Sequence, residues 1–211
     1  MAGNAPMTAS PPWTADPFDT DVEWHTDGSI LLRPRGEMEP CPMRTMDVLE
    51  HWAREAPDRV FVARRVNDGE WRKLTYRQML EKVQRIGAGL LGRGLSAERP
   101  ILILSGNGIE HLLLAFAATW AGIPYCPVSP SYSLSSGDLG KLRYVFDLLT
   151  PGLVAAFDGN TFARAVEHVP AGIPVIADTS RLGTREATIL DQIETMPDQL
   201  LAEAHARTDA D

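Results

Sequence analysis

The turn Ser105-Gly106-Asn107-Gly108 is the segment of this sequence whose residue types point most directly to chemistry. It joins an apolar run to a helical pattern, and a glycine-rich turn at the start of a helix can present backbone N–H groups to a phosphate. Its spacing fits neither G-x-G-x-x-G nor G-x-x-x-x-G-K-[ST], the patterns typical of phosphate-binding loops. A tight strand-to-helix turn with Asn107 as the helix cap is therefore the favoured interpretation, and nucleotide binding is the alternative.

The other polar residues form no recognisable catalytic or metal-binding pattern. The five histidines lack the i, i+4 spacing and the third ligand of a metal site. His111 could act as a base, but a hydrogen-bonded packing histidine is the favoured interpretation. A nucleophile turn of the type G-x-S-x-G is absent. We therefore name no catalytic, cofactor-binding or metal-binding residue.

Tyr132 is the single candidate for a substrate pocket. It lies in a serine-rich stretch, residues 129–137, whose hydroxyls have no neighbouring base and which we expect to be a polar loop. This stretch follows an apolar run that reads as a strand, and open α/β sheets bind ligands at the carboxyl ends of their strands. The ring of Tyr132 is thus expected to line a pocket there.

Composition excludes several classes of partner. The 211 residues carry a formal net charge of −8, which disfavours nucleic acid and anionic membrane surfaces. The longest apolar run, residues 112–122, is shorter than the ~20 residues that span a bilayer. Two distant cysteines, Cys41 and Cys126, indicate a reducing compartment, and no signal peptide is visible. The sequence predicts a soluble, cytoplasmic protein without nucleic-acid or membrane partners.

The first 43 residues are expected to lie outside the main domain. Residues 1–20 are rich in Pro and small polar residues and are predicted to be a flexible tail. Residues 21–43 are predicted to form a β-hairpin around Asp27-Gly28, followed by a Pro-rich connector.

Residues 44–187 have the pattern of an α/β domain. A helix from Thr45 is followed by strands at 60–66 and 71–74, and Thr75 and Gln78 form a capping box for a long amphipathic helix. From Pro100 onwards, buried strands alternate with helices, which implies a parallel sheet. We predict an incomplete doubly wound, mostly parallel sheet with helices on both faces. Residues 188–211 are predicted to be a helical segment in which the domain is truncated.

Four phrases in this domain resemble motifs of the adenylate-forming acyl-CoA synthetases, the AMP-binding superfamily. In chain order they are residues 52–60 (WAREAPDRV), 74–79 (LTYRQM), 104–110 (LSGNGIE) and 117–128 (AATWAGIPYCPV). Within the superfamily the chain is most similar to feruloyl-CoA synthases, through residues 93–100, 122–134 and 141–154. The resemblance runs from about Gly28 to about Val169.

The resemblance implies an ATP-dependent carboxylate–CoA ligase. In such enzymes a carboxylate attacks the α-phosphorus of ATP, giving an acyl adenylate and pyrophosphate, and the thiol of CoA then displaces AMP. It implies ATP, Mg²⁺ and CoA for the full-length enzyme, with a hydroxycinnamate as the aromatic acid substrate. The residues that match the family, Thr75-Tyr76 and Gly122 to Pro127, belong to motifs that look structural.

The same resemblance implies parts that these 211 residues do not contain. They are the Ser/Thr/Gly-rich phosphate loop ending in Lys, the Y-G-x-[ST]-E adenine motif, the ribose-binding Asp and the C-terminal domain with the catalytic Lys, all expected beyond residue 211. We therefore expect the chain alone to be inactive and to bind none of these cofactors tightly. Two alternatives remain: an autonomous small-molecule or protein binding module, and a nucleotide-binding domain using Ser105 to Gly108.

Overall fold

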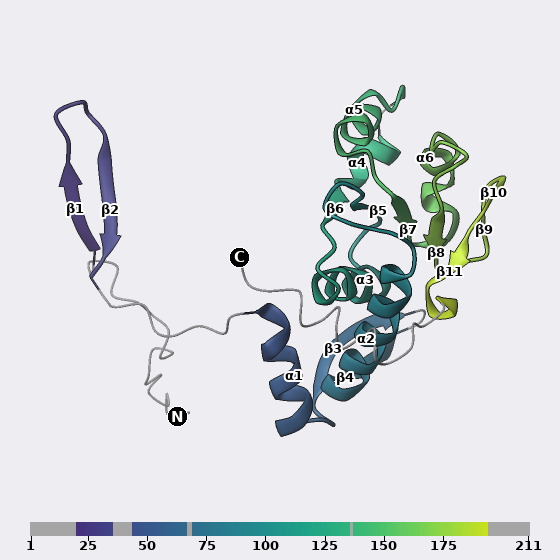
Figure 1. The fold of residues 1–211 in the computed structure, drawn as a ribbon, viewed down its shortest axis with the longest axis horizontal. Helices are drawn as coiled ribbons and strands as arrows, with labels where there is room; N and C mark the ends of the chain where they lie inside the picture. The colour runs from purple at the N-terminus through teal and green to yellow at the C-terminus, as the bar shows by residue number, and fades with distance from the viewer. Residues whose placement is uncertain (1–19, 36–43, 67–68, 136, 194–211) are drawn as a thin grey trace, which may run out of the picture. The chain divides into compact units, whose positions relative to one another are not determined.

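The computed structural model describes residues 20–35, 44–66, 69–135 and 137–193, and the chain divides into two units, Met1–Cys41 and Pro42–Asp211. The first unit is an antiparallel hairpin of β1 (Thr20–Trp24) and β2 (Ile30–Pro34), as predicted (Figure 1). Gly28 occupies a left-handed conformation at its turn, with φ of +88°. The expected tail and Pro-rich connector fall largely outside the described residues.

The second unit is built on a five-stranded parallel sheet. Its strands are β5 (Ile101–Leu104), β6 (Tyr125–Val128), β7 (Leu153–Ala156), β8 (Val175–Ala177) and β11 (Thr188–Ile189), and their order is β11-β8-β7-β5-β6. All neighbouring pairs are parallel. The predicted fold class, a mostly parallel sheet with helices on both faces, is confirmed.

Both faces of the central strands are buried, because successive side chains point in opposite directions. Ile101 and Ile103 of β5 belong to one hydrophobic cluster, whereas Leu102 and Leu104 belong to the other. All four side chains have no exposed surface. Each such burial contributes about 1.5–3 kcal/mol, so the sheet is stable only while helices cover both faces.

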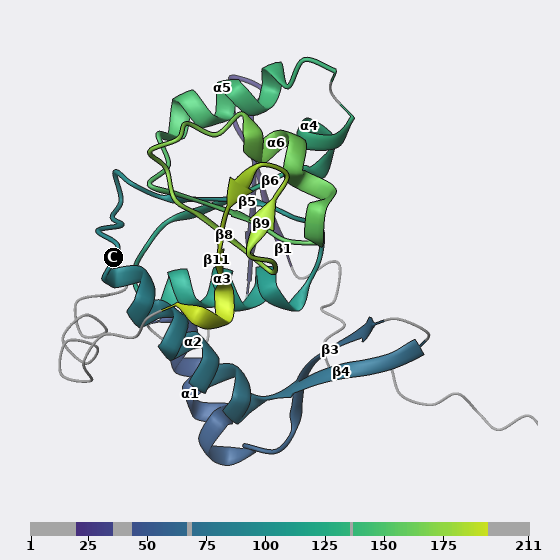
Figure 2. The ribbon, with the colours of Figure 1, turned by 90° about the vertical axis from the view of Figure 1, so that its right-hand side faces the viewer.

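Helices lie on both sides of the sheet, as Figure 2 shows. The first cluster includes side chains of α1 (Thr45–Glu55), α2 (Tyr76–Leu91) and α3 (Ile109–Trp120). The second includes side chains of α4 (Pro130–Leu134), α5 (Gly140–Leu149) and α6 (Ala163–Glu167). The helices α2 and α3 approach closely at Gly87, where a Cβ atom would stand 2.5 Å from a ring carbon of Trp120.

A second hairpin precedes α2. Its strands are β3 (Val60–Val66) and β4 (Glu70–Thr75), which pair antiparallel as predicted. Thr75 then caps α2: its hydroxyl accepts a hydrogen bond from the Gln78 N–H, and the Gln78 side chain accepts one from the Thr75 N–H. This is the predicted capping box.

Two stretches differ from the sequence-based expectation. The stretch expected to be a serine-rich loop contains the short helix α4, which Pro130 can begin because proline suits the first turn of a helix. The expected helical segment from residue 188 begins instead with strand β11, which pairs with β8, and a 3-10 turn, η3 (Leu190–Gln192). The rest of that segment, from residue 194, lies outside the described residues.

The remaining elements connect or extend the sheet. A 3-10 turn, η2 (Gly159–Phe162), precedes α6, and β9 (Arg181–Leu182) pairs antiparallel with β10 (Arg185–Glu186) between β8 and β11. Among the described helices, none has the length and hydropathy needed to cross a bilayer.

The close contact at Gly87 generates a stability prediction. We expect Gly87→Ala to lower the free energy of unfolding by about 1–3 kcal/mol, because the added methyl group would overlap a buried tryptophan ring. Glu81→Ala, on the exposed side of the same helix, should change it by less than about 0.5 kcal/mol. Urea unfolding measures both; a Gly87→Ala variant as stable as the wild type would contradict the packing described.

The turn η3 is attached to α2 through Asp191. Its carboxylate accepts hydrogen bonds from Lys82 Nζ (3.2 Å) and Arg85 Nη2 (3.0 Å). Partial burial raises the pKa of Asp191, but the hydrogen bond from Lys82 and the charges of Lys82, Arg85 and Arg72 outweigh it, so the pKa lies below its ordinary value of 3.8.

This lowered pKa predicts a pH dependence. Because the unfolded chain binds the Asp191 proton more readily, ionised Asp191 stabilises the fold above pH 3.8, and this contribution is lost as the pH falls through the folded-state pKa. We expect Asp191→Asn to cost less than about 1 kcal/mol at pH 7, because the pair is half exposed, and progressively less as the pH falls below 3.8. Thermal unfolding across pH checks this; a difference that grows at low pH would contradict it.

Candidate functional site

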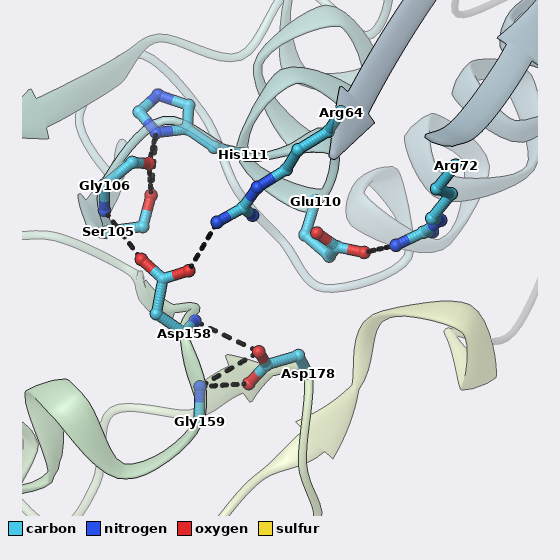
Figure 3. A network of polar contacts seen from close by, with 9 residues as sticks. All are labelled: Arg64, Arg72, Ser105, Gly106, Glu110, His111, Asp158, Gly159 and Asp178. Carbon is cyan, nitrogen blue, oxygen red and sulfur yellow. Dashed lines mark hydrogen bonds and ion pairs between the residues drawn. The ribbon is translucent and has the colours of Figure 1, made fainter. Parts of the chain in front are cut away.

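The connections of the sheet reverse direction between β5 and β7. Strand β5 leads through α3 to β6 on one side, whereas β7 leads through η2 and α6 to β8 on the other. Open α/β sheets form a crevice at such a point, outside the carboxyl ends of the strands. Figure 3 shows the polar residues that meet there.

The turn after β5 is held by Ser105 and His111. The buried Ser105 Oγ donates to the Gly106 carbonyl (2.9 Å) and lies 2.7 Å from His111 Nδ1, which is also 3.3 Å from that carbonyl. The tautomer of the His111 ring decides which atom donates in the two contacts of Nδ1. His111 is thus a hydrogen-bonded histidine that orders the turn, in agreement with the favoured sequence interpretation.

A carboxylate from the neighbouring loop faces this turn. Asp158, just after β7, accepts a hydrogen bond from the Gly106 N–H (3.2 Å) and forms an ion pair with Arg64 of β3 (3.3 Å). A second ion pair joins Arg72 of β4 to Glu110 of α3. These partly exposed pairs contribute about 0–1 kcal/mol each, and together they attach the β3–β4 hairpin to the loop after β7 and to α3.

The Asp158 loop is itself held by a second carboxylate. Asp178, just after β8, accepts hydrogen bonds from the N–H groups of Asp158 (3.0 Å) and Gly159 (3.0 Å) (Figure 3). Three backbone N–H groups of this edge therefore donate to carboxylates, and a phosphate would meet like charge there. The Gly106 N–H of the turn Ser105 to Gly108 thus already donates to a carboxylate, which disfavours the nucleotide-binding alternative weighed for this turn. The cap residue of α3 is Gly108 rather than the expected Asn107.

A pocket of about 470 Å³ lies beside this edge, between β3, α3 and β6. Its volume is within the range of small-molecule sites. Most of its lining is apolar, and the polar groups in it come from Arg64, Asn107 and His111. The apolar lining residues are Val62, Ala63, Ile109, Leu112, Ala115, Phe116, Tyr125 and Pro127.

Tyr132 stands apart from this pocket. It lies on α4, where its half-buried ring packs against the second hydrophobic cluster and Lys141 Nζ is 5.2 Å from the ring centroid. It is not among the residues that line the pocket beside β6. Sequence reasoning named Tyr132 and did not name Arg64, Asp158 or Asp178. The sequence signal available for them was an aspartate just after each of two apolar strands: Asp158 after β7 and Asp178 after β8. Loops at that end of parallel strands form the ligand-binding edge of such sheets.

The packing around Gly108 generates a prediction for this site. A Cβ atom on Gly108 would stand 2.8 Å from Arg64 Nη1, the end of a flexible side chain, and the φ of −152° suits any residue. We expect Gly108→Ala to displace the guanidinium and break its pair with Asp158, at a cost below about 1 kcal/mol. The Arg64 Nε–H resonance should shift in Gly108→Ala and stay unchanged in Gly137→Ala, where a Cβ atom meets nothing within 4 Å. A loss of several kcal/mol in Gly108→Ala would contradict this account.

Comparisons with known proteins place this fold in a family. Residues 49–204 match the family model described as AMP-binding enzyme. The chain is 26% identical over 190 residues to a salicylyl-CoA synthase / salicylate adenylyltransferase from a Streptomyces species, covering 87% of the chain and 32% of that protein. It is 32% identical over 95 residues to a phosphinothricin tripeptide synthetase of Streptomyces viridochromogenes, covering 44% of the chain and 8% of that protein.

Among solved structures, the fold is similar to fatty acyl-adenylate ligase from L. pneumophila, which was solved with acyl adenylate and pyrophosphate. The TM-score is 0.53 at 17% identity, over 80% of this chain and 26% of that one. The chain thus spans a third or less of these relatives. Since the family model covers well over half of the 211 residues and the parallel sheet agrees with it, this chain belongs to the AMP-binding enzyme family of adenylate-forming enzymes.

Proposed function

We propose that these residues are the N-terminal part of an ATP-dependent carboxylate–CoA ligase of the feruloyl-CoA synthase type, acting in the cytoplasm. The whole enzyme would activate a hydroxycinnamate as its acyl adenylate and transfer the acyl group to CoA. The observation that carries the proposal is the family match over residues 49–204. An aromatic acid substrate is supported by the similarity to a salicylate-activating protein and by the feruloyl-CoA synthase-like phrases.

In this proposal the 211 residues contribute structure rather than catalysis. They supply a sheet covered on both faces, with its carboxyl edge ordered by Ser105, Asp158 and Asp178. ATP, Mg²⁺ and CoA would act in the whole enzyme, and the chain alone would bind none of them tightly. Tyr132 remains a predicted residue of a substrate pocket that other parts of the enzyme would complete.

The pocket beside β6 favours a second candidate, a binding module for a small aromatic acid. Its apolar walls suit an aromatic ring. At its rim the Arg64 guanidinium is 42% exposed and carries more donors than its one hydrogen bond to Asp158 uses, so it could bind a carboxylate. His111 also lines the pocket, and its ring could form a hydrogen bond with a phenol.

Pyrophosphate exchange tests whether the 211 residues alone catalyse adenylate formation. With ATP, Mg²⁺ and ferulate, we expect no exchange above a protein-free blank, because the expected phosphate loop and catalytic Lys are missing from the sequence. Ferulate-dependent exchange by the 211 residues would contradict the prediction that the chain alone is inactive. A polypeptide extended through the reading frame beyond the Asp211 codon should show that exchange with ferulate and not with acetate; the reverse preference would overturn the aromatic assignment.

Ferulate binding by the chain tests the second candidate. Saturable quenching of tryptophan fluorescence that Arg64→Met weakens roughly tenfold would support the binding module, because one charge-assisted hydrogen bond would be lost. Arg77→Met is a matched control, since Arg77 forms an exposed ion pair with Asp58 away from the pocket. No saturable binding, or equal weakening by both variants, would remove this candidate.

A further inference from the structure

Three loops meet at the carboxyl edge of the sheet through backbone N–H groups that end on carboxylates. The loops follow β5, β7 and β8. The hydrogen bond from the Gly106 N–H to Asp158 Oδ2 joins residues that are 52 positions apart in the sequence. The two donors of the second loop converge on a single group, the carboxylate of Asp178. Figure 3 shows both carboxylates pointing toward these N–H groups.

The backbone of the second loop presents two successive N–H groups to one carboxylate oxygen. Asp158 and Gly159 both have left-handed angles, with φ of +81° and +57°. This turns their successive N–H groups toward the same point, at which Asp178 Oδ2 lies 3.0 Å from both nitrogens. Concave sets of consecutive N–H groups of this kind bind phosphate and other anions in proteins.

The charged groups at this edge contact one another in series, from Asp178 through Asp158 to Arg64. The Asp178 carboxylate fixes the Asp158 backbone, and the Asp158 carboxylate then contacts the Gly106 N–H and the Arg64 guanidinium. Removing the Asp178 carboxylate would therefore leave the N–H groups of Asp158 and Gly159 without an acceptor and would release the Asp158 side chain. Asp158 lies in a region that side chains other than glycine rarely adopt, so its conformation depends on such support.

We propose that Asp178 acts as a built-in anion: its carboxylate occupies the paired N–H groups of Asp158 and Gly159, which would otherwise bind a small carboxylate or a phosphate. It thereby positions Asp158, Gly106 and Arg64. This proposal does not rest on the function proposed above, because it concerns only the contacts within this edge.

The test is chemical rescue of Asp178→Ala with sodium formate, the smallest carboxylate. Formate should raise the thermal midpoint of the variant by about 3–6 °C when it exceeds its dissociation constant roughly tenfold, and sodium chloride at equal ionic strength should not. It should also return the amide resonances of Gly106, Asp158 and Gly159 toward their wild-type positions. Asp58→Ala is the matched control, since it removes one exposed, ion-paired carboxylate elsewhere.

A formate response of Asp178→Ala no larger than that of Asp58→Ala or of the wild type would overturn the proposal. Asp178→Asn provides a second measurement should the alanine variant fail to fold. The amide fills the space without the charge, so hydrogen exchange at the Asp158 and Gly159 amides should accelerate roughly tenfold and formate should have no effect. Unchanged exchange at these two amides in Asp178→Asn would equally overturn it.

Discussion

Burial of both faces of the central strands is the constraint from which the rest of this structure follows. The side chains of β5 and β7 are fully buried and alternate between two hydrophobic clusters. Neither cluster can form without helices on its own side, so the chain must cross the sheet after β6 to supply the second layer. This crossing reverses the direction of the connections and places the loops after β5 and β7 side by side.

The polar edge is a consequence of that arrangement. Loops gathered at one edge expose backbone N–H groups that need acceptors, because unpaired donors are costly where water is partly excluded. In many α/β proteins a bound ligand supplies the acceptor. Here Asp158 and Asp178 supply it, and Arg64 compensates part of their charge.

Much of the fold was predictable because its signals are local. The capping box of Thr75 and Gln78 and the apolar run at residues 101–104 each lie within one element, and the structure confirms both. The short helix α4 was missed although Pro130 suits a first turn, and the strand β11 was missed because two residues become a strand only by pairing with β8. The polar edge was harder still. The contact between Arg64 and Asp158 joins residues 94 positions apart, and periodicity within a window carries no information about such a pair.

The most direct test of this account is a titration of the wild-type chain with Mg·ATP, followed through its backbone amide resonances. The account predicts that the resonances of Gly106, Asp158 and Gly159 stay in place at millimolar nucleotide, because their N–H groups already donate to carboxylates. Saturable shifts confined to these three amides would contradict it, since they would show that phosphate replaces the carboxylates at the edge of the sheet.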